Sequence, residues 1–302
     1  MRQFGLRGDG SHCKFLVFAN GTTYGSIDFE SNSRVIFVRA LPVFDAFGHA
    51  IRSTIDNIGF AFHISWPWML LMLPLNIAGN FYVISHGVSE AEKFDAKNSL
   101  ILLVLIVVNL IAYSSIAVNW HRYVLLDEMV DGWQRLRIDG LMWRYVGNFF
   151  AIILLIAVGA FAGIFAIELA GLIFGKAPGN FGNFVLFAGL IALYAIMIVS
   201  AYRLSVKLPA IALGRRDFTL RDAWAATDGN FWQLLGLFLL FLACALLMGV
   251  VVYVVAPVFA KLGAVGLSIA LAIQLVLNWI ATILGVTLLT SLYGYFVEGR
   301  NF

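Results

Sequence analysis

The chain has 302 residues, of which 61% are hydrophobic and only 12% are charged, and its mean hydropathy is +0.90. An ordinary soluble domain is about 45 to 50% apolar, so this composition excludes a soluble protein and predicts one that lives in lipid. The net charge of +3 is ordinary for a membrane protein with basic cytoplasmic loops. We therefore expect membrane lipids as partners, and no nucleic acid.

Six apolar runs are long enough to cross a bilayer, whose core of about 30 Å requires roughly 20 mostly apolar residues in a helix. They lie near residues 62–84, 99–119, 146–170, 183–204, 231–257 and 264–293. These runs are continuously apolar, whereas the strands of a membrane β-barrel alternate. The sequence predicts an all-α membrane protein with six transmembrane helices, in which residues 41–302 form a single domain.

Lysine and arginine are concentrated on one side of the predicted helices. Sixteen of the twenty lie before the first run, between the second and third, between the fourth and fifth, or after the sixth. The four exceptions are Lys93, Lys97, Lys176 and Lys261. Because basic residues remain on the cytoplasmic side of a membrane, we predict that both termini are cytoplasmic.

Residues 1–40 are rich in Gly, Ser, Thr and Asn and show no helical period, so we predict a poorly ordered N-terminal tail. The apolar stretch from Phe15 to Ala19 is too short for the core of a signal peptide. A second interpretation stays open, in which the natural chain begins near Val35 and residues 1–34 do not belong to it.

An amphiphilic stretch precedes the first apolar run. Apolar residues recur at every third or fourth position from Val43 to Phe62, while His49, Arg52 and Asp56 lie on the other side. This pattern predicts a helix that lies flat at the headgroup boundary. His49 and His63 have no third metal ligand at a compatible spacing. We therefore interpret both histidines as solvated or interfacial and predict no metal.

The second apolar run contains one amide and ends in an interfacial pair. Asn109 lies near mid-bilayer, where an unpaired amide is costly, so we expect it to bond to another helix rather than to a substrate. Trp120 and Arg122 follow at the end of the run. Aromatic and basic residues favour the membrane interface, so both are predicted to be anchors.

A second amphiphilic stretch runs from Val124 to Arg144, with apolar residues such as Trp133 on one face, and we predict that it is a helix on the membrane surface with Trp133 as an interfacial anchor. Its acids Asp127, Glu128 and Asp131 are interleaved with arginines, so we interpret them as a self-neutralised solvated face rather than a metal cluster.

The third apolar run contains Glu168, the only acidic residue within a predicted span, and such a residue is a functional candidate by default. It lies 24 residues after Arg144, which is roughly 36 Å along a helix and close to the outer interface.

The segment from Lys207 to Asn230 is polar and basic between two apolar runs. Its Thr219-Leu220-Arg221-Asp222 sequence has the pattern of a capping box with Asp in place of Glu, which predicts a short helix. We favour this capping role for Asp222 over a catalytic one. The predicted interfacial anchors of this part of the chain are Arg203, Arg215, Arg216 and Trp224.

Two markers recur along the chain with a similar period. The triplets that begin at Asp45, Asp131 and Asp222, each an acid, a small residue and an aromatic, are separated by 86 and 91 residues. Three serines near the inner ends of the even-numbered runs, Ser115, Ser200 and Ser291, are separated by 85 and 91 residues. We predict three parallel repeats, near residues 43–123, 124–206 and 207–296, each an interfacial amphipathic helix followed by two spans.

The last apolar run has a polar stripe, in which Gln274, Asn278 and Thr282 are spaced by four residues and share one face of a helix. Such a stripe either hydrogen-bonds to neighbouring helices or lines a cavity for a polar headgroup or solute. We favour packing over a cavity.

The segment Leu208-Pro209-Ala210-Ile211-Ala212, together with Thr219-Leu220, Asp222-Ala223-Trp224 and Gly229-Asn230, resembles uncharacterised multi-pass inner-membrane proteins of proteobacteria. It is also similar to the membrane domain of some bacterial glycerophosphodiester phosphodiesterases. The resemblance implies a location in the bacterial cytoplasmic membrane and no site residues. No soluble phosphodiesterase domain is present in this sequence, so the activity of those enzymes is not implied.

Two functions remain open from the sequence. One is a non-enzymatic scaffold or regulator of envelope components, with other envelope proteins as partners, because no nucleophile or base is paired with an activating group. The other is a carrier or binder of a lipid or small amphiphilic solute, which would use the Gln274, Asn278 and Thr282 stripe together with Glu168. We predict no enzyme, no cofactor and no metal. Cys13 and Cys244 lie in different surroundings and predict no disulfide.

Overall fold

A computed structural model describes residues 4–9, 12–19, 22–28, 39–86, 96–174 and 181–302 of the chain. Within them, six helices are long and apolar enough to cross a membrane, which confirms the predicted number of such helices. They are α2 (Ile58–His86), α4 (Ala96–Leu126), α5 (Gly140–Phe174), α6 (Phe181–Ser205), α9 (Phe231–Ala260) and α10 (Gly263–Phe296). Each covers one predicted run and most extend beyond it at both ends. The connections at 87–95 and 175–180, with Lys93 and Lys176, lie outside the described residues.

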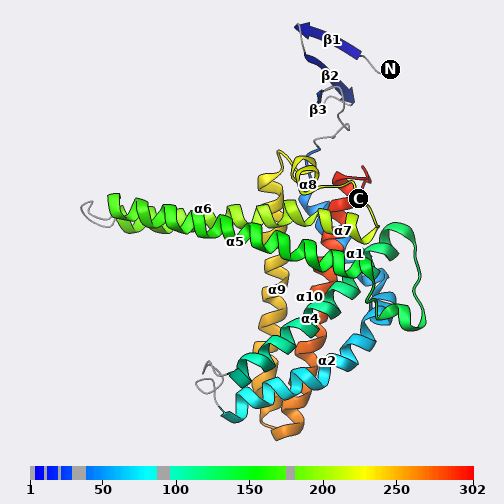
Figure 1. The fold of residues 1–302 in the computed structure, drawn as a ribbon, viewed down its shortest axis with the longest axis vertical. Helices are drawn as coiled ribbons and strands as arrows, with labels where there is room; N and C mark the ends of the chain where they lie inside the picture. Colours follow the sequence, from blue (N-terminus) through cyan, green and yellow to red (C-terminus); the bar gives the residue numbers. More distant parts are fainter. Residues whose placement is uncertain (1–3, 10–11, 20–21, 29–38, 87–95, 175–180) are drawn as a thin grey trace.

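The six helices form three pairs of packed neighbours, α2 with α4, α5 with α6 and α9 with α10. Figure 1 shows that the pairs point in different directions and come together at one end, near three short helices. These are α1 (Val43–Asp56), α7 (Lys207–Ala212) and α8 (Leu220–Ala226). We call this end the junction, and it comprises α1, α7, α8, residues 115–147 and the C-terminal part of α10 with residues 297–302.

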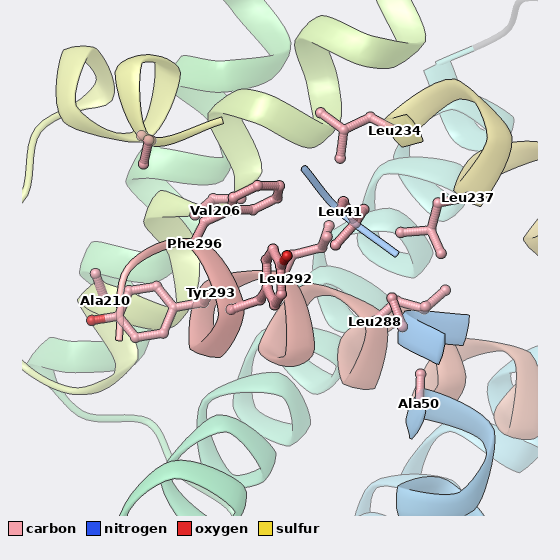
Figure 2. Close-up of a cluster of buried hydrophobic side chains, with 14 of the residues drawn as sticks. Leu41, Ala50, Val206, Ala210, Leu234, Leu237, Leu288, Leu292, Tyr293 and Phe296 are labelled. Atoms are coloured by element: carbon pink, nitrogen blue, oxygen red, sulfur yellow. The ribbon is translucent and has the colours of Figure 1, made fainter. Parts of the chain in front are cut away.

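The main buried core lies at the junction rather than along the spans. Figure 2 shows Leu41, Ala50, Val206, Leu234 and Leu292 packed together, although they come from five different parts of the chain. In contrast, only 6% of the residues in the apolar windows of α5, α6 and α9 are buried. Soluble monomers rarely expose contiguous apolar patches beyond a few hundred Å², so the exposed faces of these helices are compatible with contact to lipid.

Close packing of α5 on α6 depends on a glycine. A Cβ atom placed at Gly163 would overlap the Leu193 side chain of α6, whereas one at Gly147 would have open space around it. We expect Gly163→Leu to lower the free energy of unfolding by about 1 to 3 kcal/mol, the usual cost of overpacking. Gly147→Leu is the matched control and should have little effect. Denaturant titration of both purified variants in detergent checks this, and equal stability of the two would contradict it.

The N-terminal residues contain three strands where the sequence predicted a poorly ordered tail. They are β1 (Phe4–Asp9), β2 (His12–Ala19) and β3 (Thr22–Asp28), in an antiparallel sheet of order β1-β2-β3. The missed signals are the dipeptides Asp9-Gly10 and Asn20-Gly21, which are typical of β-hairpin turns. Val35, where the second interpretation began the natural chain, lies outside the described residues.

The helix predicted for the first amphiphilic stretch is present as α1, but much of it packs against protein. Its small residues Ala46, Ala50 and Thr54 are buried, and α1 packs mainly against α10 and α9. The predicted apolar stripe is divided, because Phe47 packs on the core while Phe44 is 79% exposed. The exposed parts of the stripe, around Phe44 and Ile55, are therefore available to lipid.

The second amphiphilic stretch differs from the predicted helix. Between the end of α4 and the start of α5, the structure has only a single 3-10 turn, η1 (Gly132–Arg135). Asp127 has a positive φ of 53°, which ends α4 and turns the chain. As a result Val130 is buried and Trp133 is 86% exposed, although a helix would have placed both on one face.

The segments that precede the three helical pairs make contacts in a cyclic order. The segment before α2 and α4 is α1, which packs chiefly on α10 and α9. The segment before α5 and α6 contains η1, which contacts α2 and α4. The segment before α9 and α10 contains α8, which packs on α6. Each segment therefore contacts the helical pair that precedes it in the sequence. The first segment, α1, contacts the last pair, α9 and α10.

Candidate functional site at the junction

A buried histidine links all three helical pairs. His121 on α4 is fully buried, with its Nδ1 atom 2.8 Å from Thr290 Oγ1 on α10 and its Nε2 atom 3.3 Å from Tyr145 Oη on α5. Thr290 Oγ1 donates to the Val286 carbonyl oxygen at 2.8 Å, so it accepts from a protonated Nδ1. Nε2 then accepts from the Tyr145 hydroxyl. A neutral His121 imidazole is therefore compatible with all of these hydrogen bonds.

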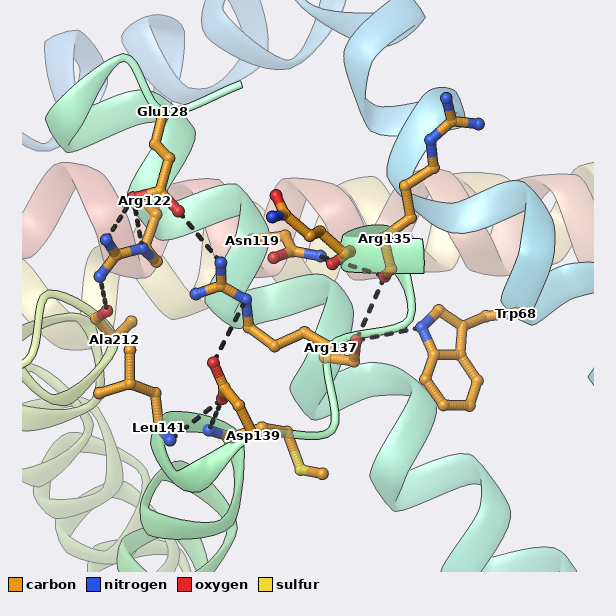
Figure 3. A network of polar contacts seen from close by, with 12 residues as sticks. Trp68, Asn119, Arg122, Glu128, Arg135, Arg137, Asp139, Leu141 and Ala212 are labelled. Carbon is orange, nitrogen blue, oxygen red and sulfur yellow. Dashed lines mark hydrogen bonds and ion pairs between the residues drawn. The ribbon is translucent and has the colours of Figure 1, made fainter. Parts of the chain in front are cut away.

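A carboxylate holds two arginines beside this histidine. Glu128 Oε2 accepts from Arg122 Nε at 2.8 Å and also from Arg122 Nη2, and Glu128 Oε1 accepts from Arg137 Nη2 at 3.0 Å. Arg122 Nη1 donates to the Ala212 carbonyl oxygen at the end of α7, as Figure 3 shows. Hydrogen bonding and charge from Arg122, supported by Arg137, lower the pKa of Glu128 below its usual value, although burial acts in the opposite sense.

The η1 segment is fastened through its backbone. Asn119 Nδ2 donates to the Arg135 carbonyl oxygen at 3.1 Å, and Ser115 Oγ donates to the same oxygen at 3.4 Å. Trp68 Nε1 on α2 donates to Ser115 Oγ at 3.1 Å. These bonds satisfy the Arg135 carbonyl oxygen of an irregular segment, which lies against α2 and α4.

Arg203, at the end of α6, makes the equivalent attachment to α8. Its guanidinium donates to Thr227 Oγ1 at 3.0 Å and to the Trp224 carbonyl oxygen at 2.7 Å, and it pairs with Asp228 at 3.0 Å. It also lies 3.9 Å from the centre of the Trp224 ring. Arg203 thus connects to protein, and its hydrogen bonds fix the C-terminal end of α8.

The N-terminal end of α8 has the predicted capping box. Asp222 N donates to Thr219 Oγ1 at 3.2 Å, and Thr219 N donates to Asp222 Oδ2 at 2.7 Å. We expect Thr219→Ala to lower stability by about 1 kcal/mol, because it leaves a helical N–H without its partner. Thr219→Ser keeps the hydroxyl and should retain most of the stability. Denaturant titration of both variants checks this, and indistinguishable losses would contradict it.

A cavity of about 160 Å³ lies at the junction between α1, the ends of α4 and α10, and residues 297–302. His49 on α1 contributes to it, with Nδ1 3.2 Å from Ser291 Oγ. Burial, together with the nearby charge of Arg52, lowers the pKa of His49. The His49 imidazole is therefore neutral at pH 7, with one nitrogen as a donor and the other as an acceptor. His63 instead donates from Nε2 to the Val130 carbonyl oxygen at 3.1 Å.

The intramembrane polar candidates do not come together in one site. Asn109 Nδ2 donates to the Leu105 carbonyl oxygen of its own helix at 2.7 Å, where a bond to another helix was expected. Glu168 is exposed on α5. Gln274 and Asn278 are also exposed, while Thr282 is half-buried and donates to the Asn278 carbonyl oxygen at 2.8 Å. The stripe thus lies on an open face of α10, and neighbouring helices do not cover its Gln274 and Asn278 amides.

The predicted interfacial anchors divide into two groups. Trp133, Arg216 and Trp224 are exposed, as an anchor requires. Trp120 is fully buried among residues of α2, Val130 and α10, which differs from the prediction, because α4 continues past the predicted end of the run. Arg122 and Arg203 hold protein groups, and so does Arg215, whose Nη1 donates to Tyr293 Oη at 2.8 Å.

The sequence interpretation missed His121 and Tyr145, and it treated Glu128 as solvated. A histidine that follows a tryptophan at the end of an apolar run has the pattern of an interfacial residue, so no local signal distinguished His121. The mixture of acids and arginines in this segment indicated pairing, but Asp127 and Asp131 matched that pattern as well as Glu128 did. Among the described residues, no group of three His, Cys, Asp or Glu side chains is placed to hold a metal ion.

Comparisons with known proteins show no similarity that identifies a family. No family model matches the chain, and neither a curated protein nor a solved structure is significantly similar to it. What the chain does is therefore argued below from its own residues.

Proposed function

We propose that the chain is a multi-pass protein of the bacterial inner membrane that scaffolds or regulates envelope components without catalysing a reaction. The observation that supports this role is the use of polar groups at the junction. His121, Glu128 and Arg203 each bond to helices or segments of the protein itself. These side chains hold the three helical pairs together at the junction. Such an arrangement suits a rigid anchoring protein whose helical pairs extend into the lipid.

We further propose that the helical pairs are three parallel repeats of about 90 residues in cyclic order. Supporting this, two of the recurring serines, Ser115 and Ser291, bond to the segment that begins the next repeat, at Arg135 and His49 respectively. In the remaining repeat, Arg203 follows Ser200 by three residues and bonds to α8. In each of the three places the recurring serine, or an arginine one turn after it, bonds to the segment that begins the next repeat, and this is expected if the units share an origin and an orientation.

The location and orientation are also part of this proposal. The bias of Lys and Arg supports a junction on the cytoplasmic side, with both termini there and with Trp133, Arg216 and Trp224 at the headgroups. The resemblance of the 208–230 segment to inner-membrane proteins of proteobacteria supports the bacterial membrane. Labelling of single cysteines with a membrane-impermeant maleimide tests the orientation. A cysteine at Arg216 should react only after the cells are opened.

The deciding experiment for the scaffold role is mass spectrometry of what co-purifies with the full chain in a mild detergent. Specific envelope proteins at fixed stoichiometry are expected, together with altered envelope composition in a deletion strain. Recovery of lipids alone, with unchanged envelope composition in that strain, would overturn the scaffold role.

A second candidate is a carrier or binder of a lipid or small amphiphilic solute. The observation that favours it is the exposure of the Gln274 and Asn278 amides on α10, because amides that face hydrocarbon without a partner are costly. Under this proposal a polar headgroup or solute satisfies them. Replacing both residues with leucine should then abolish lipid exchange between vesicles, whereas a scaffold would keep its protein partners after the same change.

A further inference from the structure

The junction cavity combines polar side chains from three parts of the chain. Its polar lining consists of His49 and Ser53 from α1, Thr290 and Ser291 from α10, and Arg300 and Asn301 from the C-terminal residues. A single water needs about 10 to 15 Å³ of such volume. The cavity, at about 160 Å³, therefore has room for a ligand of several non-hydrogen atoms.

The C-terminal residues close one side of this cavity and are fixed in place. Phe302 stacks on Tyr295, with ring centres 5.0 Å apart, and lies 5.3 Å from the His49 ring. Arg39 donates to the Arg300 carbonyl oxygen at 3.5 Å and to the Asn301 side chain. Arg300 Nη2 donates to the Leu125 carbonyl oxygen at 3.2 Å. These contacts hold the Arg300 and Asn301 side chains at the cavity wall.

The charges around the cavity favour an anion. Arg300 lines it, Arg39 contacts the adjoining residues, and Arg52 is close enough to lower the pKa of His49. None of the side chains in the lining is a carboxylate, and the one carboxylate there is the main-chain terminus of Phe302. One acidic side chain, Glu298, lies next to the cavity, 2.7 Å from Arg300 Nε. Against these two negative groups stand Arg300, Arg39 and Arg52, so the surroundings keep an excess of positive charge.

We propose that this cavity binds a phosphate monoester group, carried by a lipid headgroup or by a small soluble molecule. The Arg300 guanidinium supplies charged donors, and the hydroxyls of Ser53 and Ser291 supply neutral ones from other directions. A tetrahedral group with three terminal oxygens accepts from several directions at once, whereas a planar carboxylate accepts in one plane. The proposal does not depend on the scaffold role, since a scaffold and a carrier could each hold such a ligand.

The test measures binding to the purified full chain by two probes. Glycerol 3-phosphate is titrated calorimetrically into the protein in detergent, and phosphatidic acid is compared with phosphatidylcholine in nanodiscs by native mass spectrometry. We expect saturable binding of at least one phosphate monoester. Arg300→Gln should weaken it at least about tenfold, the scale of one lost charge-assisted hydrogen bond. Lys261→Gln, which removes an exposed cation at the far end of α9, is the control and should bind normally.

A second variant keeps the test decisive if Arg300→Gln is unstable. Ser53→Leu leaves every arginine in place and fills part of the cavity, so it should also abolish binding. Binding of glycerol 3-phosphate supports a soluble ligand, and retention of phosphatidic acid alone supports a lipid headgroup. Absence of binding by both probes would overturn the proposal. Unchanged binding in Arg300→Gln and Ser53→Leu would do the same, because the anion would then be held elsewhere.

Discussion

Replacing Glu128 with alanine should lower the free energy of unfolding by about 2 to 3 kcal/mol, because its half-buried carboxylate accepts charge-assisted hydrogen bonds from two arginines. The change leaves Arg122 without its counter-charge and Arg137 with Asp139 alone, and these two arginine side chains are only 18% and 11% exposed. The loss also removes one attachment of the 127–139 segment to α4, while the bonds of Asn119 and Ser115 to the Arg135 carbonyl oxygen remain. Denaturant titration of the purified full chain in mild detergent measures this effect.

The control for Glu128→Ala is Asp131→Ala, which removes an acid from the same segment. The Asp131 side chain is 88% exposed and lies 3.7 Å from Arg135. Exposed pairs of this kind contribute about 0 to 1 kcal/mol, so the change should have little effect. A loss as large as that of Glu128→Ala would show that the segment is sensitive to any change of charge, and that the Arg122 and Arg137 pairs have no special role.

The same carboxylate gives the stability a defined dependence on pH. The pKa of Glu128 is lowered in the folded state by Arg122 and Arg137. Its contribution is therefore complete above the unfolded pKa of about 4.3 and is lost as the pH falls through the folded pKa. Between pH 6 and pH 3 the wild type should lose more stability than Glu128→Gln, whose amide does not titrate. Parallel losses in the two proteins would exclude Glu128 as the source.

Replacing His121 with alanine should lower stability by about 2 to 4 kcal/mol. The change opens a cavity at a fully buried position and leaves the hydroxyls of Tyr145 and Thr290 without their common partner. His121→Asn keeps a donor near the position of Nδ1 and should recover part of the loss. The control is His63→Ala, because the His63 side chain is 35% exposed. Melting temperatures of the three variants check this, and equal shifts for His121→Ala and His63→Ala would contradict it.

Composition and local pattern were sufficient for the six long helices and for the short helix α8. The apolar runs were long enough to identify all six candidate spans, because the length of a spanning helix is fixed by the thickness of the bilayer. The Thr219 and Asp222 capping box was also readable, since its bonds join residues three positions apart. The dipeptides Asp9-Gly10 and Asn20-Gly21 are equally local signals and are typical of β-hairpin turns.

Partners distant in sequence could not be read from the chain. Tyr145 and Thr290 lie 24 and 169 residues from His121, and no local pattern in a single sequence encodes such a pairing. The periodicity of the second amphiphilic stretch predicted a helix, but the turn at Asp127 and the pairing of Glu128 with Arg122 outweigh that weak local preference. Likewise, α1 packs its small residues on α10, because Ala46 and Ala50 permit an approach that larger side chains would prevent.

The sequence by itself determined that this is a helical membrane protein with six candidate spans, because apolar length is a property of contiguous residues. Only the tertiary structure decided that the buried core lies at one end, that His121 joins three helical pairs, and that residues 297–302 close a polar cavity. The physical reason is that hydrocarbon is as apolar as the side chains of the spans, so burial within the membrane does not specify which helices meet. Hydrogen bonds and ion pairs between distant residues at the junction make that choice.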